Sequence, residues 1–261
     1  MKKIFLLITL AICILACKKE SSNPTNNSTT NSNSTNPVTC IDNPNINFTC
    51  IGTPIGKFSD CIKDMDGNTY KTVTIGTQTW MAENLKTSKY NDGTSIPNVT
   101  DGKQWKELTK GAWCNYNNSD SLGKIYGKLY NWFAVSPTTN GNKNVCPVGW
   151  HVPTDSEWTI LSIYLGGEIN SGSKMKETGN SRWLITNSLL STNSSLFTGL
   201  PGGYKFEIGN YINLNKYGYW WTSSESNEFD SFNYLLYEEN NDLDRDDTNK
   251  SNGFSIRCIK D

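Results

Sequence analysis

The sequence predicts an α+β fold, with short helices early in the chain and a meandering antiparallel sheet late in it. One observation is a capped helix: Thr154 and Glu157 form a Ser/Thr-x-x-Glu capping box, and Gly166-Gly167 supplies a stop. The other is the chain after residue 195, where short β-prone runs are separated by Gly, Pro and Asn. Helices followed by grouped strands are typical of the α+β class.

The composition excludes nucleic-acid binding as a function class. The 261 residues carry a net charge of −1, whereas a nucleic-acid partner calls for a basic excess or a basic stripe. The hydrophobic fraction of 36% is low for a globular chain, mainly because of a polar segment near the N-terminus. The rest of the chain, about 200 residues, is long enough for one well-buried core.

Residues 1–16 predict a signal peptide. Two lysines precede an apolar run, Ile4 to Ala16, which is too short to cross a bilayer as a helix. The run leads into "ILAC", which resembles the lipobox of bacterial lipoproteins, so we expect cleavage before Cys17 and lipidation of its thiol. The alternative is an ordinary signal peptide followed by a chance cysteine.

Residues 17–38 predict a tether that begins at the lipidated cysteine. The segment is rich in Asn, Ser and Thr and has almost nothing to bury, so we expect it to be disordered. Lys18 and Lys19 differ from the aspartate associated with inner-membrane retention in some bacteria. We therefore expect an outer-membrane lipoprotein whose domain faces the cell surface or the periplasm, with the membrane as a partner through the lipid.

An even number of cysteines remains once Cys13 and Cys17 are set aside, which indicates disulfides in an exported chain. The six are Cys40, Cys50, Cys61, Cys114, Cys146 and Cys258. No Cys-x-x-Cys pair occurs and the chain has one histidine, so a zinc site is not expected. The aspartates around Gly67 do not follow the calcium-loop order. We expect no metal and no cofactor.

The regular domain is expected to span residues 62–261, after an irregular cysteine-containing lead-in at 39–61. Asp66-Gly67 lies between extended runs and predicts a hairpin turn. Helices are predicted at residues 100–109, with Thr100 as the N-cap, at 126–135 and at 154–167.

A short strand is predicted at residues 148–152, where it ends at Pro153. The later strand candidates are "SLFTGL", "GYKFEI", "YINL", "YGYWWTSS", "FNYLLYE" and "GFSIRCI". In the last, Phe254, Ile256 and Cys258 alternate with Ser255 and Arg257, as a half-buried strand does. The acidic run "EENNDLDRDD", residues 238–247, is expected to be a solvated turn, with a weak cation site as the alternative.

The stretch "CPVGWHVPTDSEW", residues 146–158, contains many reactive residue types. Most of them have a structural explanation. Glu157 is explained by capping, Asp155 by the helix N-terminus and Trp158 by the core. His151 has no second titratable partner nearby in sequence. We therefore expect a structural or exposed histidine rather than a catalytic one.

Seven motifs, in order, resemble the Fibrobacter succinogenes major paralogous domain (FISUMP), a family of mostly exported bacterial domains that often occur on lipoproteins. The motifs are "DGNTYKTVTIGTQTWMAENLKTSKYNDGTSIPNVTD", "GAWCNYNN", "YGKLYNWFAV", "CPVGWHVPTDSEW", "LPGGYKF", "YWWTSSES" and "NGFSIRCIKD". The resemblance covers about residues 62–261.

A looser resemblance reaches to the layout shared by formylglycine-generating enzymes and C-type lectins, because "CPVGWHVPTDSEW" is followed much later by "GFSIRC". That layout implies a disulfide between Cys146 and Cys258, and Cys114 is then expected to pair with Cys40, Cys50 or Cys61. The copper-binding cysteine pair of the enzymes is not matched, nor are the calcium-binding triplets of the lectins.

The residues favour a non-catalytic binding or adhesion domain at the cell surface, with glycans or a protein as candidate ligands. The candidate ligand-binding residues are Tyr219, Trp220, Trp221 and Glu225. At most one of the two tryptophans can face inward from a regular strand, so the other needs a ligand or a second layer. The alternatives are a diverged enzyme of the formylglycine-generating type and a structural display protein, although no catalytic motif occurs.

Overall fold

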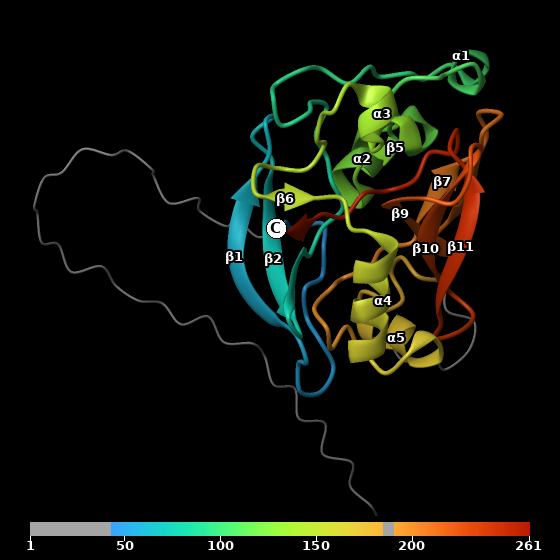
Figure 1. Ribbon diagram of the computed structural model, residues 1–261. Coiled ribbons are helices and arrows are strands. Elements are labelled where there is room, and N and C mark those ends of the chain that lie inside the picture. Colours follow the sequence, from blue (N-terminus) through green and yellow to red (C-terminus); the bar gives the residue numbers. More distant parts are fainter. Residues whose placement is uncertain (1–42, 185–190) are drawn as a thin grey trace, which may run out of the picture.

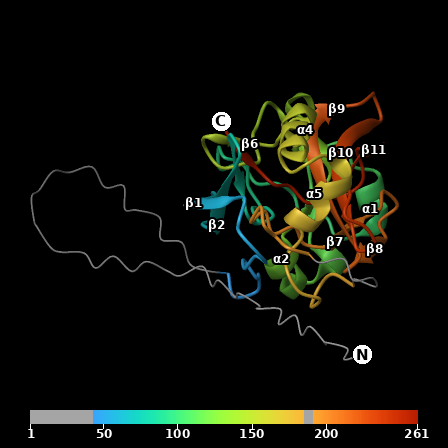
Figure 2. The same ribbon diagram turned by 90° about the horizontal axis from the view of Figure 1, so that it is seen from below.

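The computed structural model describes residues 43–184 and 191–261 and confirms the α+β class. Two five-stranded sheets and a two-stranded sheet make up its β structure (Figures 1 and 2). The predicted signal peptide at 1–16, the lipidated Cys17 and the tether to residue 38 lie outside the described residues. No helix within the described ranges is both long and apolar enough to cross a membrane.

The first sheet joins strands from both ends of the domain in the order β1-β2-β3-β12-β6. Its strands are β1 Lys57–Lys63, β2 Thr69–Ile75, β3 Gln78–Met81, β6 Trp150–His151 and β12 Ile259–Lys260. The predicted hairpin at Asp66-Gly67 joins β1 to β2, and the Asp64 carboxylate accepts hydrogen bonds from the Asp66 and Asn68 backbone. The irregular lead-in is shorter than predicted, because β1 already begins at Lys57.

The second sheet has the order β11-β10-β9-β7-β8 and contains one parallel pair, β7 with β9. Its strands are β7 Gly202–Lys205, β8 Tyr211–Leu214, β9 Tyr217–Glu225, β10 Asp230–Tyr237 and β11 Leu243–Asn249. A small sheet pairs β4 Trp113–Cys114 with β5 Leu129–Tyr130.

The helices are short, as predicted, and two of them pack on the second sheet (Figure 1). They are α1 Gly102–Lys106, α2 Asp120–Tyr126, α3 Pro137–Asn140, α4 Asp155–Tyr164 and α5 Glu168–Met175. Helix α4 contacts β9 and β10, and α5 contacts β11. The capping box of α4 is confirmed: Thr154 and Glu157 exchange side-chain-to-backbone hydrogen bonds.

Two predicted helices differ from the structure. Residues 126–135 form the end of α2, β5 and a 3₁₀ turn, because the Tyr130 and Trp132 amides bond to the Phe254 and Lys250 carbonyls at 2.8 and 2.9 Å. In the segment 100–109 only α1 is helical, and Asp101 rather than Thr100 caps it. Helix α5 was not predicted.

The acidic run at 238–247 is only partly a turn, and the prediction is wrong for its second half. Residues from Leu243 onward form β11, the edge strand that pairs with β10. Charged residues suit an edge strand, because they oppose pairing with a further chain. The "SLFTGL" run forms no strand, and the only regular strand pairing of the C-terminal run is β12.

The C-terminal segment lies inside the domain rather than on one face of a sheet. Residues 252–259 are all buried, including Ser255 and Arg257, which alternation places outside. The disulfide implied by the resemblance is present: Cys146 and Cys258 are joined with a Cα–Cα distance of 5.9 Å. This bridge connects the strand-to-helix corner before α4 with the last strand.

A buried amide, that of Asn84, links the C-terminal segment to its neighbours. Its oxygen accepts from the Trp220 indole at 2.8 Å and from the Arg257 guanidinium at 2.6 Å. Its nitrogen donates to the Tyr126 carbonyl at 2.8 Å and the Ser255 hydroxyl at 3.2 Å. Arg257 is completely buried, and burial lowers its pKa to about 9, so the guanidinium remains protonated at neutral pH.

Replacing Asn84 by Ala is expected to lower the free energy of unfolding by about 3 kcal/mol or more, because it leaves a buried guanidinium and an indole N–H without their acceptor. Urea denaturation followed by tryptophan fluorescence measures this. The control is Asn210→Ala, at an exposed position. Equal stability of the two variants would contradict the linking role of Asn84.

The double substitution of Cys146 and Cys258 by Ser is expected to lower the unfolding free energy by about 4–5 kcal/mol in the chain-entropy model, because the bridge spans 112 residues. Denaturant titration of the double variant against the oxidised parent tests it. A loss below about 1 kcal/mol would mean that the bridge contributes little to the folded state.

Candidate ligand-binding surface

Two of the predicted ligand-binding residues, Trp220 and Trp221, belong to the core, and that prediction is wrong. Both side chains have no exposed surface. Trp220 packs with Trp158 and Phe197 on the helix side of the second sheet, whereas Trp221 packs with Phe254 on the other side. A second core layer, rather than a ligand, therefore covers the second tryptophan.

Glu225, a third predicted residue, lies exposed at the end of β9 and forms an ion pair. Its carboxylate accepts from the ammonium of Lys250, whose side chain is only 6% exposed. The Lys250 ammonium also donates to the Asn227 and Glu228 carbonyls, both at 2.6 Å. Glu225 thus neutralises a nearly buried lysine, which is a structural task.

The fourth predicted residue, Tyr219, lies in a group of half-buried aromatic rings on one side of the second sheet. We call this group the tyrosine face, and it consists of Tyr204, Tyr217, Tyr219 and Tyr237. The ring centroids of Tyr204 and Tyr219 are 4.7 Å apart, those of Tyr217 and Tyr237 are 4.8 Å apart, and those of Tyr217 and Tyr219 are 6.1 Å apart.

Buried rings hold the tyrosine face in place. Phe254 stacks on Tyr219 with centroids 4.8 Å apart, and it also stacks on Trp221 at 4.4 Å. Residues two apart on a strand share a face, so β9 itself places Tyr217, Tyr219 and Trp221 in one row. The row runs from a covered tryptophan to half-exposed tyrosines.

Polar groups border the tyrosine face on both sides. The Asn213 amide donates to the Tyr219 hydroxyl at 3.1 Å. On the edge strand, Asp244 lies opposite Leu235 and Asp246 lies opposite Asn233. Since directly opposite residues share a face, these two aspartates lie on the side of the sheet that carries Tyr219.

The phenols of this face remain neutral hydrogen-bonding groups. Burial raises the pKa of Tyr219 strongly, and it also raises that of Tyr237, where the Asp244 carboxylate adds to the rise. Burial is the main cause that raises the pKa of Tyr204, and the charge of Glu207 raises it further. A neutral phenol can both donate and accept a hydrogen bond while its ring presents an apolar surface.

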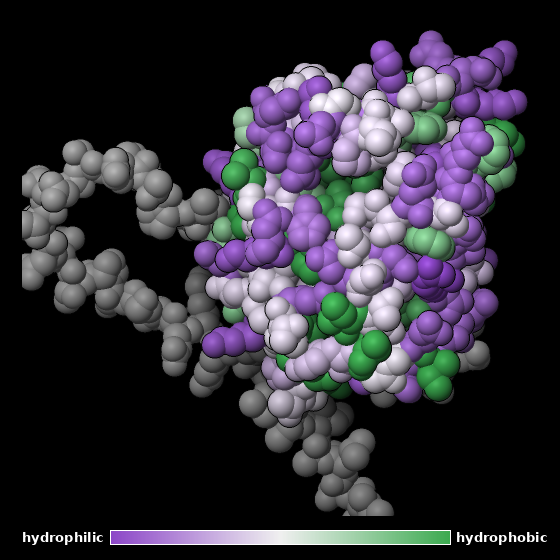
Figure 3. Space-filling view, in the orientation of Figure 1, coloured by the Kyte–Doolittle hydropathy of each residue, from purple (hydrophilic) through white to green (hydrophobic). Residues whose placement is uncertain are grey.

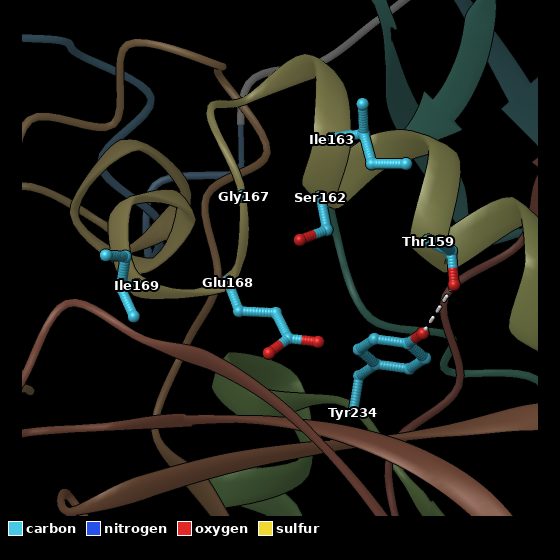
Figure 4. A pocket seen from close by; sticks show the side chains of 7 residues that line it. All are labelled: Thr159, Ser162, Ile163, Gly167, Glu168, Ile169 and Tyr234. Carbon is cyan, nitrogen blue, oxygen red and sulfur yellow. Dashed lines mark hydrogen bonds between the residues drawn. The ribbon is translucent and has the colours of Figure 1, made fainter.

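A hollow with a volume of about 390 Å³ lies elsewhere, between α4, α5 and β10. Figure 4 shows the Glu168 carboxylate pointing into it, with Ile163 and Ile169 at opposite margins. The Tyr234 hydroxyl at its base is 3.1 Å from the Thr159 hydroxyl. The hollow therefore offers one carboxylate and one phenol that is already hydrogen-bonded.

Exposed isoleucines lie on the helices beside this hollow. Ile163 on α4 is 69% exposed, and Ile169 on α5 is 71% exposed. Figure 3 shows a few separate hydrophobic side chains in this region of the surface, surrounded by neutral and hydrophilic ones. The arrangement could accept an apolar group beside the Glu168 carboxylate.

His151 has two carboxylate partners, and the prediction that it has no titratable partner nearby in sequence is wrong, because Glu157 is one of them. Its Nδ1 lies 2.7 Å from the Asp261 carboxylate, and its Nε2 lies 3.0 Å from the Glu157 carboxylate. Burial by itself lowers the pKa of His151, but these two hydrogen bonds and charges outweigh it, so the pKa is raised. Asp261 comes from 110 residues away, which sequence proximity does not show.

The expected disulfide of Cys114 is not formed, and this prediction is wrong. Cys114 is a free, fully buried thiol on β4, packed with Trp105 and Leu129. Burial raises its pKa to about 11. Cys61 is disulfide-bonded. The even cysteine count misled because a thiol can serve simply as a small apolar core residue.

No group of three metal-binding side chains occurs within residues 43–184 and 191–261. The sequence identified Tyr219 but missed Tyr204, Tyr237, Asp244 and Asp246 as its neighbours. The alternation of Tyr217 and Tyr219 was the signal available. Which strands flank β9, and in which register, depends on tertiary pairing.

A family model described as the Fibrobacter succinogenes major domain matches residues 73–260 of the chain. None of the curated proteins matches the chain, and none of the solved structures does.

The pKa of His151 is expected to lie above 6.5, and Asp261→Asn is expected to lower it, because one of the two carboxylate partners is removed. A raised folded-state pKa means that this contribution to stability is fully present below the unfolded pKa and is lost as the pH rises through the folded one. NMR titration gives the value directly, since the chain has a single histidine. Glu168→Gln on α5 serves as the control, and a shift of equal size there would contradict the assignment.

Proposed function

This chain belongs to the Fibrobacter succinogenes major domain family, and we propose that its domain is a non-catalytic binding module that takes up glycans at the tyrosine face. The observation that carries the proposal is the set of four half-buried tyrosines that share one face of the second sheet.

The chemistry of the face suits a sugar. A pyranose has an apolar C–H side that packs on an aromatic ring, and hydroxyls that need hydrogen-bond partners. Tyrosine offers both an apolar ring and a polar tip at a low cost in side-chain entropy. Asn213, Asp244 and Asp246 border the rings with amide and carboxylate groups, which can bond to hydroxyls.

The lectin-like layout is part of the proposal. The Cys146–Cys258 bridge joins the corner before α4 to the last strand, which is the arrangement that the resemblance implies. We further propose that the domain is exported and held at the outer membrane by lipid on Cys17. Bonded cysteines within the domain support an oxidising compartment.

A catalytic role is the weaker candidate. His151 with Glu157 and Asp261 is the grouping that most resembles acid–base machinery. Both ring nitrogens are engaged by carboxylates, so neither is available to take a proton from a substrate. We interpret the group as an ion-pair link between the first sheet and α4.

Glycan-array screening of the purified full chain, followed by calorimetry with the best ligand, tests the binding proposal. Tyr219→Ala and Tyr237→Ala are each expected to weaken binding by about tenfold, since each removes a stacking ring. The matched control is Tyr164→Ala, because Tyr164 is an exposed tyrosine on α4, away from the face. Absence of glycan binding, or equal loss in all three variants, would falsify the proposal.

A further inference from the structure

Most of the charged groups around the tyrosine face are carboxylates. Glu207, Glu239, Asp244 and Asp246 are among the acids that raise the pKa of these tyrosines. Two of them, Asp244 and Asp246, are two residues apart on the edge strand and therefore face the same side.

The cations of the same strands are turned to the other side. Lys205, next to Tyr204, places its ammonium 4.5 Å from the Trp105 ring centre and within 3.3 Å of the Thr100 carbonyl. Arg245, between the two aspartates, pairs with Asp155 of α4 at 2.7 Å. The exposed lysine next to the face in sequence is Lys216, in the turn before β9. The edge strand thus turns Asp244 and Asp246 to the tyrosine side, and Arg245 and Asp247 to the other side.

An amide donor on the same side of the sheet has no partner. The Asn233 side chain is 1% exposed, and its nitrogen makes no hydrogen bond with any described residue. Asn233 alternates with Leu235 and Tyr237 on β10 and lies opposite Asp246. Buried donors are normally satisfied, so this amide is an unpaired polar group at the covered end of the face, where Asn233 lies opposite Trp221.

We propose that the tyrosine face selects glycans that carry free amino groups, with the ammonium of an amino sugar placed between the tyrosine rings and the carboxylates of Asp244 and Asp246. This inference rests on the proposed glycan binding and adds the charge class of the sugar. Charge complementarity identifies the occupant, because the face combines aromatic rings and carboxylates while Lys205 and Arg245 point away.

The recognition uses two interactions that a neutral sugar cannot make. An ammonium near a tyrosine ring is attracted to the negative face of the π-system. It also donates charge-assisted hydrogen bonds to carboxylates, which are stronger than those of a hydroxyl.

Calorimetry with two probes of equal length tests the inference: a glucosamine hexasaccharide with free amines and its fully N-acetylated counterpart. The full chain is titrated at mildly acidic pH, where the sugar amines are protonated and the aspartates are ionised. We expect the free-amine probe to bind more tightly, and the difference to shrink as salt is added.

The double variant Asp244→Asn with Asp246→Asn is expected to weaken binding of the free-amine probe by about fivefold, as for two exposed ion pairs, and to weaken binding of the N-acetylated probe by less, because an amide still bonds to hydroxyls but does not pair with an ammonium. Asp247→Asn is the matched control, since Asp247 lies on the same strand but faces the opposite side and accepts from Ser226. Thermal unfolding of each variant checks that the fold is retained.

Equal binding of both probes overturns the inference but leaves the glycan proposal standing. Binding of neither probe, together with an empty glycan array, overturns both. An oligolysine of the same charge that competes as strongly as the glucosamine probe also overturns the inference, because recognition then depends on charge without the sugar.

Discussion

The hydrogen bonds of the Asn84 side chain are the constraint on which the rest of the structure depends. This amide joins the chain after β3 to α2, β9 and the C-terminal segment, and it gives the buried Arg257 guanidinium its side-chain acceptor. A buried charge without partners costs several kcal/mol, so the guanidinium fixes how these segments meet. The guanidinium also donates a hydrogen bond to the Phe197 carbonyl and lies over the Phe197 ring. The C-terminal segment therefore lies between the two sheets rather than at a surface.

That placement explains why both tryptophans of β9 are buried. The Trp220 indole donates a hydrogen bond to Asn84 and is buried in the core beneath α4. Trp221 stacks on Phe254 in the core on the other side of the sheet. Further along β9, Tyr219 still stacks on Phe254 but is only half-buried, and Tyr217 is half-buried as well. The tyrosine face thus continues the core that contains Trp221 and Phe254, and Phe254 supports it from beneath. A rigid aromatic platform loses little entropy when a ligand binds.

The helix at 154–167, the hairpin at Asp66-Gly67 and most late strands could be predicted because short-range patterns specify them. The structure of the segment 126–135 could not be predicted in this way. Its apolar spacing favours a helix, but its backbone instead forms hydrogen bonds with Phe254 and Lys250, which are distant in the sequence. The edge strand β11 looked like a turn, since its acidic residues give no apolar alternation. Within the site, Tyr219 was found from local aromatic content, whereas Asp244 and Asp246 join it only through strand pairing.

The sequence by itself determined the family, the α+β class and the corner that begins with Cys146, because capping, alternation and motif order are local properties of the chain. The tertiary structure alone decided which side chains are buried and which charges meet. It buried Arg257 and Trp221, left Cys114 without a disulfide, and brought Asp261 to His151. The physical reason is that burial and electrostatic interactions depend on distance in space, and these contacts join residues that are up to 173 positions apart in the chain.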